Sequence, residues 1–145
     1  MLLKSRFMIG LVAALIAGTA LADIQHIVVF RYRADVAAAT KADLAAHFLA
    51  LKDLATRDGQ RYIVSITGGQ AISKEGFDQG LEQAFVVTFK NEADRNYFVG
   101  KPYSDTMDPA HQTLVQMVVP LIAVDAAGKL SGIFVFDFSD VRSAR

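Results

Sequence analysis

The sequence predicts an α+β protein with the ferredoxin-like order βαββαβ, in which a four-stranded antiparallel sheet carries its helices on one face. Two observations give this order: four runs rich in β-branched and aromatic residues, and helical segments that follow the first and third runs. A third observation is that the strands are apolar at both alternating parities. A sheet that is apolar on both faces needs a second cover, and the simplest cover is another copy of the chain. We therefore expect a twofold homodimer.

The first 22 residues are typical of a secretory signal peptide. Lys4 and Arg6 form a positive start, residues 7–16 are almost wholly apolar, and residues 20–22 read Ala-Leu-Ala, a small-x-small cleavage pattern. The interpretation is cleavage after Ala22, which predicts a periplasmic or secreted protein. The alternative is an uncleaved N-terminal anchor, although the apolar run is short against the ~20 residues of a membrane span.

The remaining chain has the size and composition of one globular domain. The protein has 145 residues, with 15 basic and 15 acidic side chains and no cysteine. We expect the domain over residues 23–138 and a polar C-terminal tail over residues 139–145. The even charge balance argues against nucleic acid as the main partner, and no second apolar run predicts membrane contact after signal cleavage. The lack of cysteine excludes disulfides and thiolate nucleophiles.

In the first half of the domain, residues 24–32 are predicted to form a strand, because β-branched and aromatic side chains dominate them. Residues 40–57 read as a helix, with Thr40 and Asp43 in the positions of a capping box and Asp58-Gly59 as its stop. A second strand is predicted over residues 61–66, where Gly68-Gly69 breaks or bulges it. Residues 71–82 form a long loop.

In the second half, a third strand is predicted over residues 84–90, followed by a short helix that Asn91 caps and that reaches residue 99. A loop over residues 100–108 precedes a helix that Asp108 caps and that ends near residue 121. A turn over residues 125–129 leads to the last strand, residues 130–138. The two helices together take the place of the second helix in the βαββαβ pattern.

His111 is the main candidate for a functional side chain. Asp108 is a good N-cap and Pro109 suits the first helical position, which places His111 in the first turn. The helix dipole and burial both disfavour a charged imidazole there, so His111 is predicted to be neutral and able to act as a base. The alternative is a histidine that is simply hydrogen-bonded in a core crevice. Behind it at helical spacing lie Leu114, Val115 and Val118.

Three stretches together resemble the stress-responsive dimeric α/β-barrel (Dabb) domain family. They are Gln-His-Ile-Val-Val-Phe-Arg-Tyr at residues 25–32, Ala-Phe-Val-Val-Thr-Phe at residues 84–89 and Pro-Ala-His at residues 109–111. The resemblance implies a homodimer in which two ferredoxin-like sheets form a barrel. The family includes plant stress proteins, bacterial members of unknown role and a polyketide-cyclising enzyme.

From that enzyme the resemblance implies three catalytic roles. His111, which follows Pro-Ala, would be the general base, with the first-strand His26 and the upstream Tyr97 as helpers. An insertion at residues 100–107 separates Tyr97 from His111 and makes Tyr103 a competitor for the tyrosine role. Asp108 stands where relatives often have a second histidine.

The same residues predict an apolar pocket for a small molecule. Val28 and Phe30 share a strand face with His26, and Phe85 and Val115 are expected to complete the lining. The expected ligand is a small apolar, aromatic or carbonyl-bearing molecule. The spacing of the histidines predicts no metal site, no cofactor motif is present, and His47 is interpreted as structural.

Three hypotheses for function follow. The first is an exported homodimer that binds such a ligand, with a stress-linked role. The second is a cofactor-independent enzyme of the cyclase, isomerase or oxygenase type that uses His111 as general base. The third is a stress-related structural dimer without a ligand, in which the histidines are merely packed.

Overall fold

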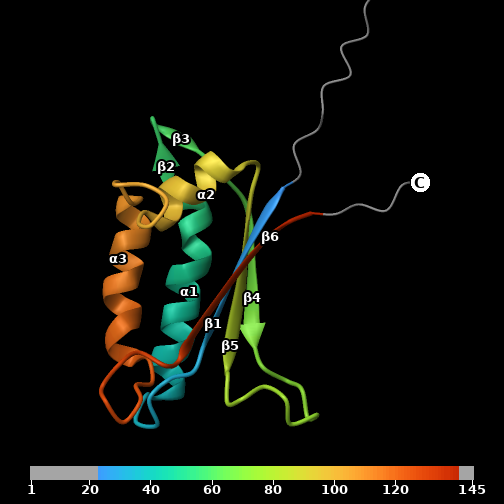
Figure 1. The fold of residues 1–145 in the computed structure, drawn as a ribbon, viewed down its shortest axis with the longest axis vertical. Coiled ribbons are helices and arrows are strands. Elements are labelled where there is room, and N and C mark those ends of the chain that lie inside the picture. Colours follow the sequence, from blue (N-terminus) through green and yellow to red (C-terminus); the bar gives the residue numbers. More distant parts are fainter. Residues whose placement is uncertain (1–22, 141–145) are drawn as a thin grey trace, which may run out of the picture.

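The computed structural model describes residues 23–140, so the predicted signal peptide and the last five residues lie outside the described part. The chain forms two layers, a sheet and a set of helices on one of its faces (Figure 1). In chain order the elements are β1 (Ile24–Phe30), α1 (Ala38–Leu54), β2 (Thr56–Arg57), β3 (Gln60–Arg61), β4 (Ile63–Gln70), β5 (Gln83–Phe89), α2 (Glu92–Val99), α3 (Pro109–Val118), the 3-10 turn η1 (Val119–Leu121) and β6 (Ile133–Ser139).

The main sheet has the strand order β4-β5-β1-β6, and every neighbouring pair is antiparallel. This is the predicted ferredoxin-like arrangement, with β1 and β5 in the centre and β6 at one edge. His26 in β1 lies between Val87 of β5 and Asp137 of β6 in the register. No helix of the described residues is long and apolar enough to span a membrane.

The core lies between the sheet and the helices. Alternate residues of β1 are buried, as the sequence pattern predicts, because the pleat turns every second side chain toward the helices. The rings of Phe48 in α1 and Phe85 in β5 stack at 3.9 Å between centroids, and Phe30 lies 6.0 Å from Phe85. These three rings fill the middle of the core.

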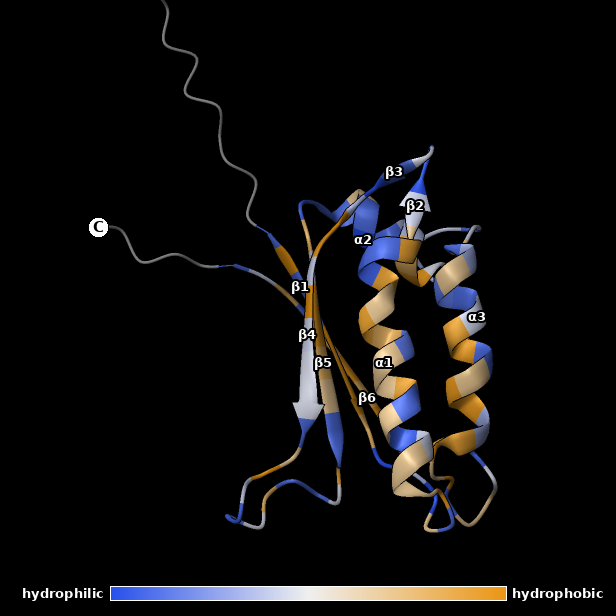
Figure 2. Ribbon diagram, turned by 180° about the vertical axis from the view of Figure 1, so that it is seen from behind, coloured by the Kyte–Doolittle hydropathy of each residue, from blue (hydrophilic) through white to orange (hydrophobic). Residues whose placement is uncertain are grey.

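The opposite face of the sheet is apolar and uncovered within the described chain. Figure 2 shows hydrophobic residues along β1, β5 and β6. On β6 the exposed rings are Phe134, Phe136 and Phe138, while Ile27 and Val29 of β1 are only partly buried on the same face. The structure therefore has the two-sided apolar sheet on which the expectation of a second copy rests.

Two sequence-based predictions near the first helix are wrong. The helix begins at Ala38, and its N-cap Ala37 offers no side-chain hydrogen bond, so Thr40 and Asp43 do not form the predicted capping box. The helix also ends at Leu54, and Asp58-Gly59 forms the turn of the β2–β3 hairpin instead. Both turn residues have positive φ angles, 52° and 74°, which suit the tight hairpin turn that Asp-Gly favours.

The predicted break at Gly68-Gly69 is also absent, since β4 continues to Gln70 and its register irregularity lies between Ile63 and Ser65. Gly68 is needed for another reason: a Cβ atom there would lie 2.7 Å from the carbonyl oxygen of Ala84 and closer still to the ring of Phe85. The glycine thus allows close strand pairing above a large core ring. The last strand begins at Ile133, later than predicted.

Candidate functional site

A cavity of about 190 Å³ lies between α3 and the half of the sheet formed by β1 and β6. The predicted pocket residues Val28, Phe30 and Val115 line it, and Phe85 lies behind Phe48, outside the lining. The walls are almost entirely apolar, and both His26 and His111 are part of them. The complete lining is His26, Val28, Phe30, Phe48, Val99, His111, Leu114, Val115, Val118, Val119, Ile133 and Val135.

The start of α3 is built as the sequence predicts. Asp108 is the N-cap, and its Oδ1 accepts hydrogen bonds from the backbone N–H groups of Ala110 at 2.8 Å and His111 at 3.1 Å. Its second oxygen accepts from the Tyr62 hydroxyl at 2.9 Å. Asp108 is fully buried, so these bonds hold the first turn of α3, and with it His111, against the end of the sheet.

The ring of His111 lies flat against Phe98, with 3.9 Å between ring centroids and 17° between planes. Its Nδ1 is 2.7 Å from the carbonyl oxygen of Phe98. Because a carbonyl oxygen can only accept, Nδ1 must carry the proton, which leaves an unprotonated Nε2 in the neutral ring. Burial lowers the pKa of His111 to about 4, so the ring is neutral at physiological pH.

His26 is held by a carboxylate. Its Nδ1 lies 2.6 Å from Oδ1 of Asp137, its cross-strand neighbour. The neutral ring donates from Nδ1 to this carboxylate and again leaves Nε2 unprotonated. Burial lowers the pKa of His26, an effect that the Asp137 hydrogen bond and charge partly oppose.

Asp137 is a site residue that the sequence analysis missed. Its other oxygen pairs with the guanidinium of Arg95 in α2, and the Tyr103 ring lies 4.1 Å from the Arg95 Cζ atom. Tyr103 therefore covers the Arg95 side of the network and does not line the cavity. The signal for Asp137 was present in the sequence, because a single carboxylate inside an otherwise apolar strand needs a buried partner.

Both imidazole rings line the cavity. Within the described residues neither Nε2 has a hydrogen-bond partner, whereas every fully enclosed side-chain nitrogen or oxygen has one. The two atoms are therefore accessible, and the cavity is the space that both rings line. The site thus presents two unprotonated imidazole nitrogens to an apolar chamber.

The other two predicted residues lie elsewhere. The hydroxyl of Tyr97 is 3.5 Å from the carbonyl oxygen of Thr56, and its ring packs on Tyr62, away from the cavity. The structure does not bring Tyr97 to the two histidines. His47 is half-exposed on α1, where its Nδ1 is 2.9 Å from the carbonyl oxygen of Asp43. Among residues 23–140 no three metal-ligating side chains gather at one place.

Comparison with known proteins identifies relatives at the level of family and fold. The model of the Stress responsive A/B Barrel Domain (Dabb) matches residues 24–140. A comparison with curated proteins finds no match.

Solved structures with the same fold come from plants and bacteria. A hydroxynitrile lyase from Passiflora edulis is 17% identical with a TM-score of 0.64, covering 86% of this chain and 98% of the lyase. A protein from Arabidopsis thaliana is 16% identical with a TM-score of 0.63, covering 84% of this chain and 99% of its own. A dimeric ferredoxin-like protein of unknown function from Jannaschia sp. is 18% identical with a TM-score of 0.61. The match covers 81% of this chain and 99% of that protein. At these identities the likeness shows a shared fold.

Proposed function

The chain belongs to the Stress responsive A/B Barrel Domain family, and we propose that it binds a small aromatic or carbonyl-bearing molecule between His26 and His111. The observation that carries this proposal is that two imidazole rings, each with Nδ1 engaged and Nε2 free of protein partners, line one apolar cavity. Unpartnered polar atoms are costly in an apolar interior unless a ligand or water satisfies them. A ligand with a polar group beside an apolar ring would do so.

The volume of the cavity limits the size of the ligand. A chamber of about 190 Å³ exceeds only slightly the cavity of roughly 150 Å³ that holds a benzene molecule. One substituted ring, or an aliphatic group of that size, fits without rearrangement. Since an unprotonated Nε2 accepts hydrogen bonds, the ligand should carry a hydroxyl group or an acidic C–H next to a carbonyl.

Catalysis is the second candidate function, and the His26–Asp137 pair favours it. A neutral histidine can remove an acidic proton without a cofactor, and a carboxylate on the opposite nitrogen stabilises the imidazolium that forms. In a cyclase, isomerase or oxygenase type of reaction, His111 would act as the base, and His26 would be a second base whose imidazolium Asp137 stabilises. That the Passiflora edulis protein is a hydroxynitrile lyase supports the idea that this fold can carry a small-molecule reaction.

Binding can be tested with phenol and acetophenone by calorimetry and ligand-observed NMR. His111→Asn and His26→Asn keep a side-chain donor for Phe98 and Asp137 but remove Nε2, so each should weaken binding at least tenfold. His47→Asn, on the exposed side of α1, is the matched control and should bind normally. Equal binding by all three variants, or no binding by the wild type together with destabilised histidine variants, would favour packed histidines without a ligand.

The proposal includes a homodimer closed over the open face of the sheet. The exposed Phe134, Phe136 and Phe138 form a contiguous apolar strip on β6, and such strips on soluble proteins usually lie in an interface. Solved proteins of this fold that are described as dimeric support this assembly.

Export is part of the same proposal and rests on the signal pattern of residues 1–22. In a bacterial host that makes the full chain, the periplasmic fraction should contain a protein whose N-terminal residue is Asp23. A chain that stays in the membrane fraction with its first residues intact would instead be an anchored protein.

A further inference from the structure

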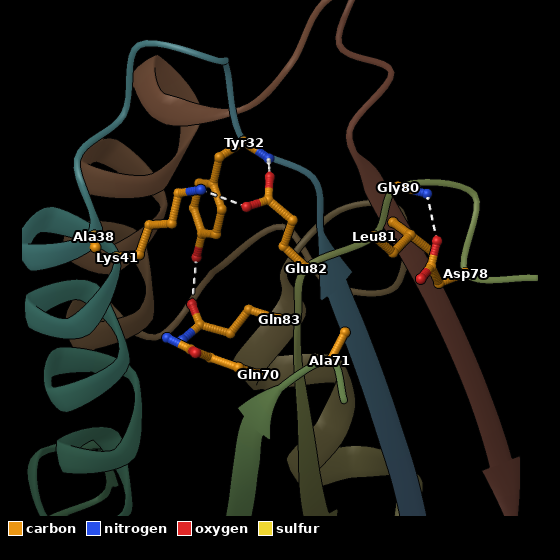
Figure 3. A pocket seen from close by; sticks show the side chains of 10 residues that line it. All are labelled: Tyr32, Ala38, Lys41, Gln70, Ala71, Asp78, Gly80, Leu81, Glu82 and Gln83. Carbon is orange, nitrogen blue, oxygen red and sulfur yellow. Dashed lines mark hydrogen bonds and ion pairs between the residues drawn. The ribbon is translucent and has the colours of Figure 1, made fainter. Parts of the chain in front are cut away.

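A second, larger cavity lies where β1 ends and α1 begins, beside the end of β4 and the start of β5 (Figure 3). It has a volume of about 430 Å³ and mixed polar and apolar walls. The polar side chains in its lining are those of Tyr32, Lys41, Gln70, Asp78, Glu82 and Gln83.

The packed core separates this polar cavity from the histidine cavity. Phe30 and Phe48 line the histidine cavity, Phe85 packs against both of them, and none of the three almost completely buried rings lines the polar cavity. The two cavities have no common lining residue. A ligand in one of them therefore does not reach the polar groups of the other.

Gln83 gives the polar cavity an unused hydrogen-bond donor. The residue is only 4% exposed, and its Oε1 accepts a hydrogen bond from the Tyr32 hydroxyl at 2.5 Å (Figure 3). Its Nε2 has no partner among residues 23–140, where every fully enclosed side-chain nitrogen or oxygen has one. The Nε2 group is therefore accessible, and Figure 3 shows the Gln83 amide among the side chains that line this cavity. An amide N–H group that is free of protein partners at the wall of a cavity can donate to an acceptor bound there.

The remaining polar groups balance one another in charge. Lys41 forms an ion pair with Glu82, and the other oxygen of Glu82 accepts the Tyr32 backbone N–H at 3.1 Å. The Lys41 ammonium also lies 5.2 Å from the centre of the Tyr32 ring. Donors therefore come from Lys41 and the glutamine amides, and acceptors from the carboxylates of Glu82 and Asp78. A strongly negative ligand would lie near the carboxylates of Glu82 and Asp78, and a strongly positive ligand would lie near the Lys41 ammonium.

We propose that this polar cavity is a second binding site, which takes a neutral polyhydroxylated molecule about the size of a monosaccharide. A hydroxyl group both donates and accepts, so a set of hydroxyls can satisfy amide, ammonium and carboxylate groups together without adding charge. One ligand hydroxyl would accept from the free Nε2 of Gln83. Others would reach Glu82 and Lys41 at the mouth. The proposal is independent of the function assigned to the histidine cavity.

The test uses glucose, galactose, mannose and myo-inositol with the full mature chain labelled with ¹⁵N. At least one of them should shift the Gln83 side-chain amide resonance in a saturable way, with a Kd near the millimolar range. Gln83→Leu removes the donor and should weaken binding at least tenfold. Ala38→Leu fills the exposed rim of the cavity from the first turn of α1, so it should block binding without disturbing the core.

Two matched variants complete the design. Gln60→Leu, in the exposed β2–β3 hairpin, and His111→Asn, in the other cavity, should both bind as the wild type does. The proposal is overturned if none of the four compounds saturates below about 50 mM, or if Gln83→Leu and Ala38→Leu both bind normally. Binding of succinate or malate in place of the neutral compounds would also overturn it.

Discussion

His111 is tied to Phe98 twice: its ring lies 3.9 Å from the Phe98 ring, and its Nδ1 lies 2.7 Å from the Phe98 carbonyl oxygen. The first contact buries the imidazole, and the second fixes which nitrogen carries the proton. Because Phe98 belongs to α2 and His111 to α3, the pair also joins the two helices at the end of the cavity. The contacts with Phe98 therefore keep the His111 ring neutral, with its proton on Nδ1.

Acid should destabilise the protein through His111. The pKa of His111 falls from 6.5 to about 4 on folding, chiefly because burial disfavours the charged ring. Between these values the unfolded chain binds a proton that the folded chain does not, so stability is lost as the pH falls from 6.5 toward 4. A shift of this size corresponds to roughly 3 kcal/mol. Urea unfolding at a series of pH values measures the slope.

The control for this pH dependence is His111→Asn, which keeps a donor for the Phe98 carbonyl but cannot titrate. Its unfolding free energy should vary less with pH between 6.5 and 4 than that of the wild type. An unchanged slope in the variant would mean that other groups cause the acid sensitivity.

Asp137→Asn should destabilise the protein strongly. The substitution leaves the guanidinium of Arg95, which is 8% exposed, without its carboxylate, and breaking one side of a buried pair costs about 3–5 kcal/mol. It should also lower the pKa of His26 further, since Asp137 opposes the effect of burial. Chemical unfolding and an NMR titration of His26 check the two effects.

The surface offers a matched pair for comparison. Asp43 and His47 also form an aspartate–histidine contact, at 3.6 Å, but both side chains are at least half-exposed. Asp43→Asn should therefore change the unfolding free energy by less than about 1 kcal/mol. If Asp43→Asn and Asp137→Asn lowered the unfolding free energy by similar amounts, burial would not explain the cost at Asp137.

How far the sequence predicts the structure depends on the range of the interactions. The caps Asp108 and Asn91 act within three residues, and both are found as predicted. The roles of Asp58-Gly59 and Gly68 were misassigned, because one depends on a neighbouring short strand and the other on the Phe85 ring across the sheet. Two of the three predicted caps are therefore found, and the capping box of Thr40 and Asp43 fails because the helix begins at Ala38; contacts between strands are harder to predict from the sequence.

The same limit applies to the site. The alternation in β1 places His26 on the buried face, and the cap places His111 in the first turn of α3. The family resemblance led us to expect both histidines in one pocket, whereas the contact of Asp137 with His26 follows only from the strand order with β6 beside β1. The polar cavity had no sequence signal, since Gln83 and Tyr32 are brought together by pairing of β1 with β5.

Gly68→Ala should destabilise the sheet, whereas Gly69→Ala should not. A Cβ atom at Gly68 would lie 2.7 Å from the backbone oxygen of Ala84, which cannot move aside, and nothing lies within 4 Å of a Cβ atom at Gly69. We expect a cost of about 1–3 kcal/mol for the first variant and a change within about 0.5 kcal/mol for the second. Thermal and urea unfolding of the two neighbours provide the comparison, and equal stability would refute the close packing at Gly68.

Phe136→Glu should convert the proposed homodimer into a monomer. Phe136 lies in the middle of the exposed β6 strip and is 52% exposed in the single chain, so a carboxylate there would not weaken the core. In a dimer closed over this face, the charge would be buried without a partner, which costs more than a weak interface can offset. Light scattering at micromolar concentration should show the wild-type dimer and the variant monomer. Leu54→Glu changes a leucine that is 62% exposed at the end of α1, in the helix layer and not in the sheet, and should remain dimeric. If the wild type is itself a monomer, or if both variants dissociate, the sheet face is not the interface.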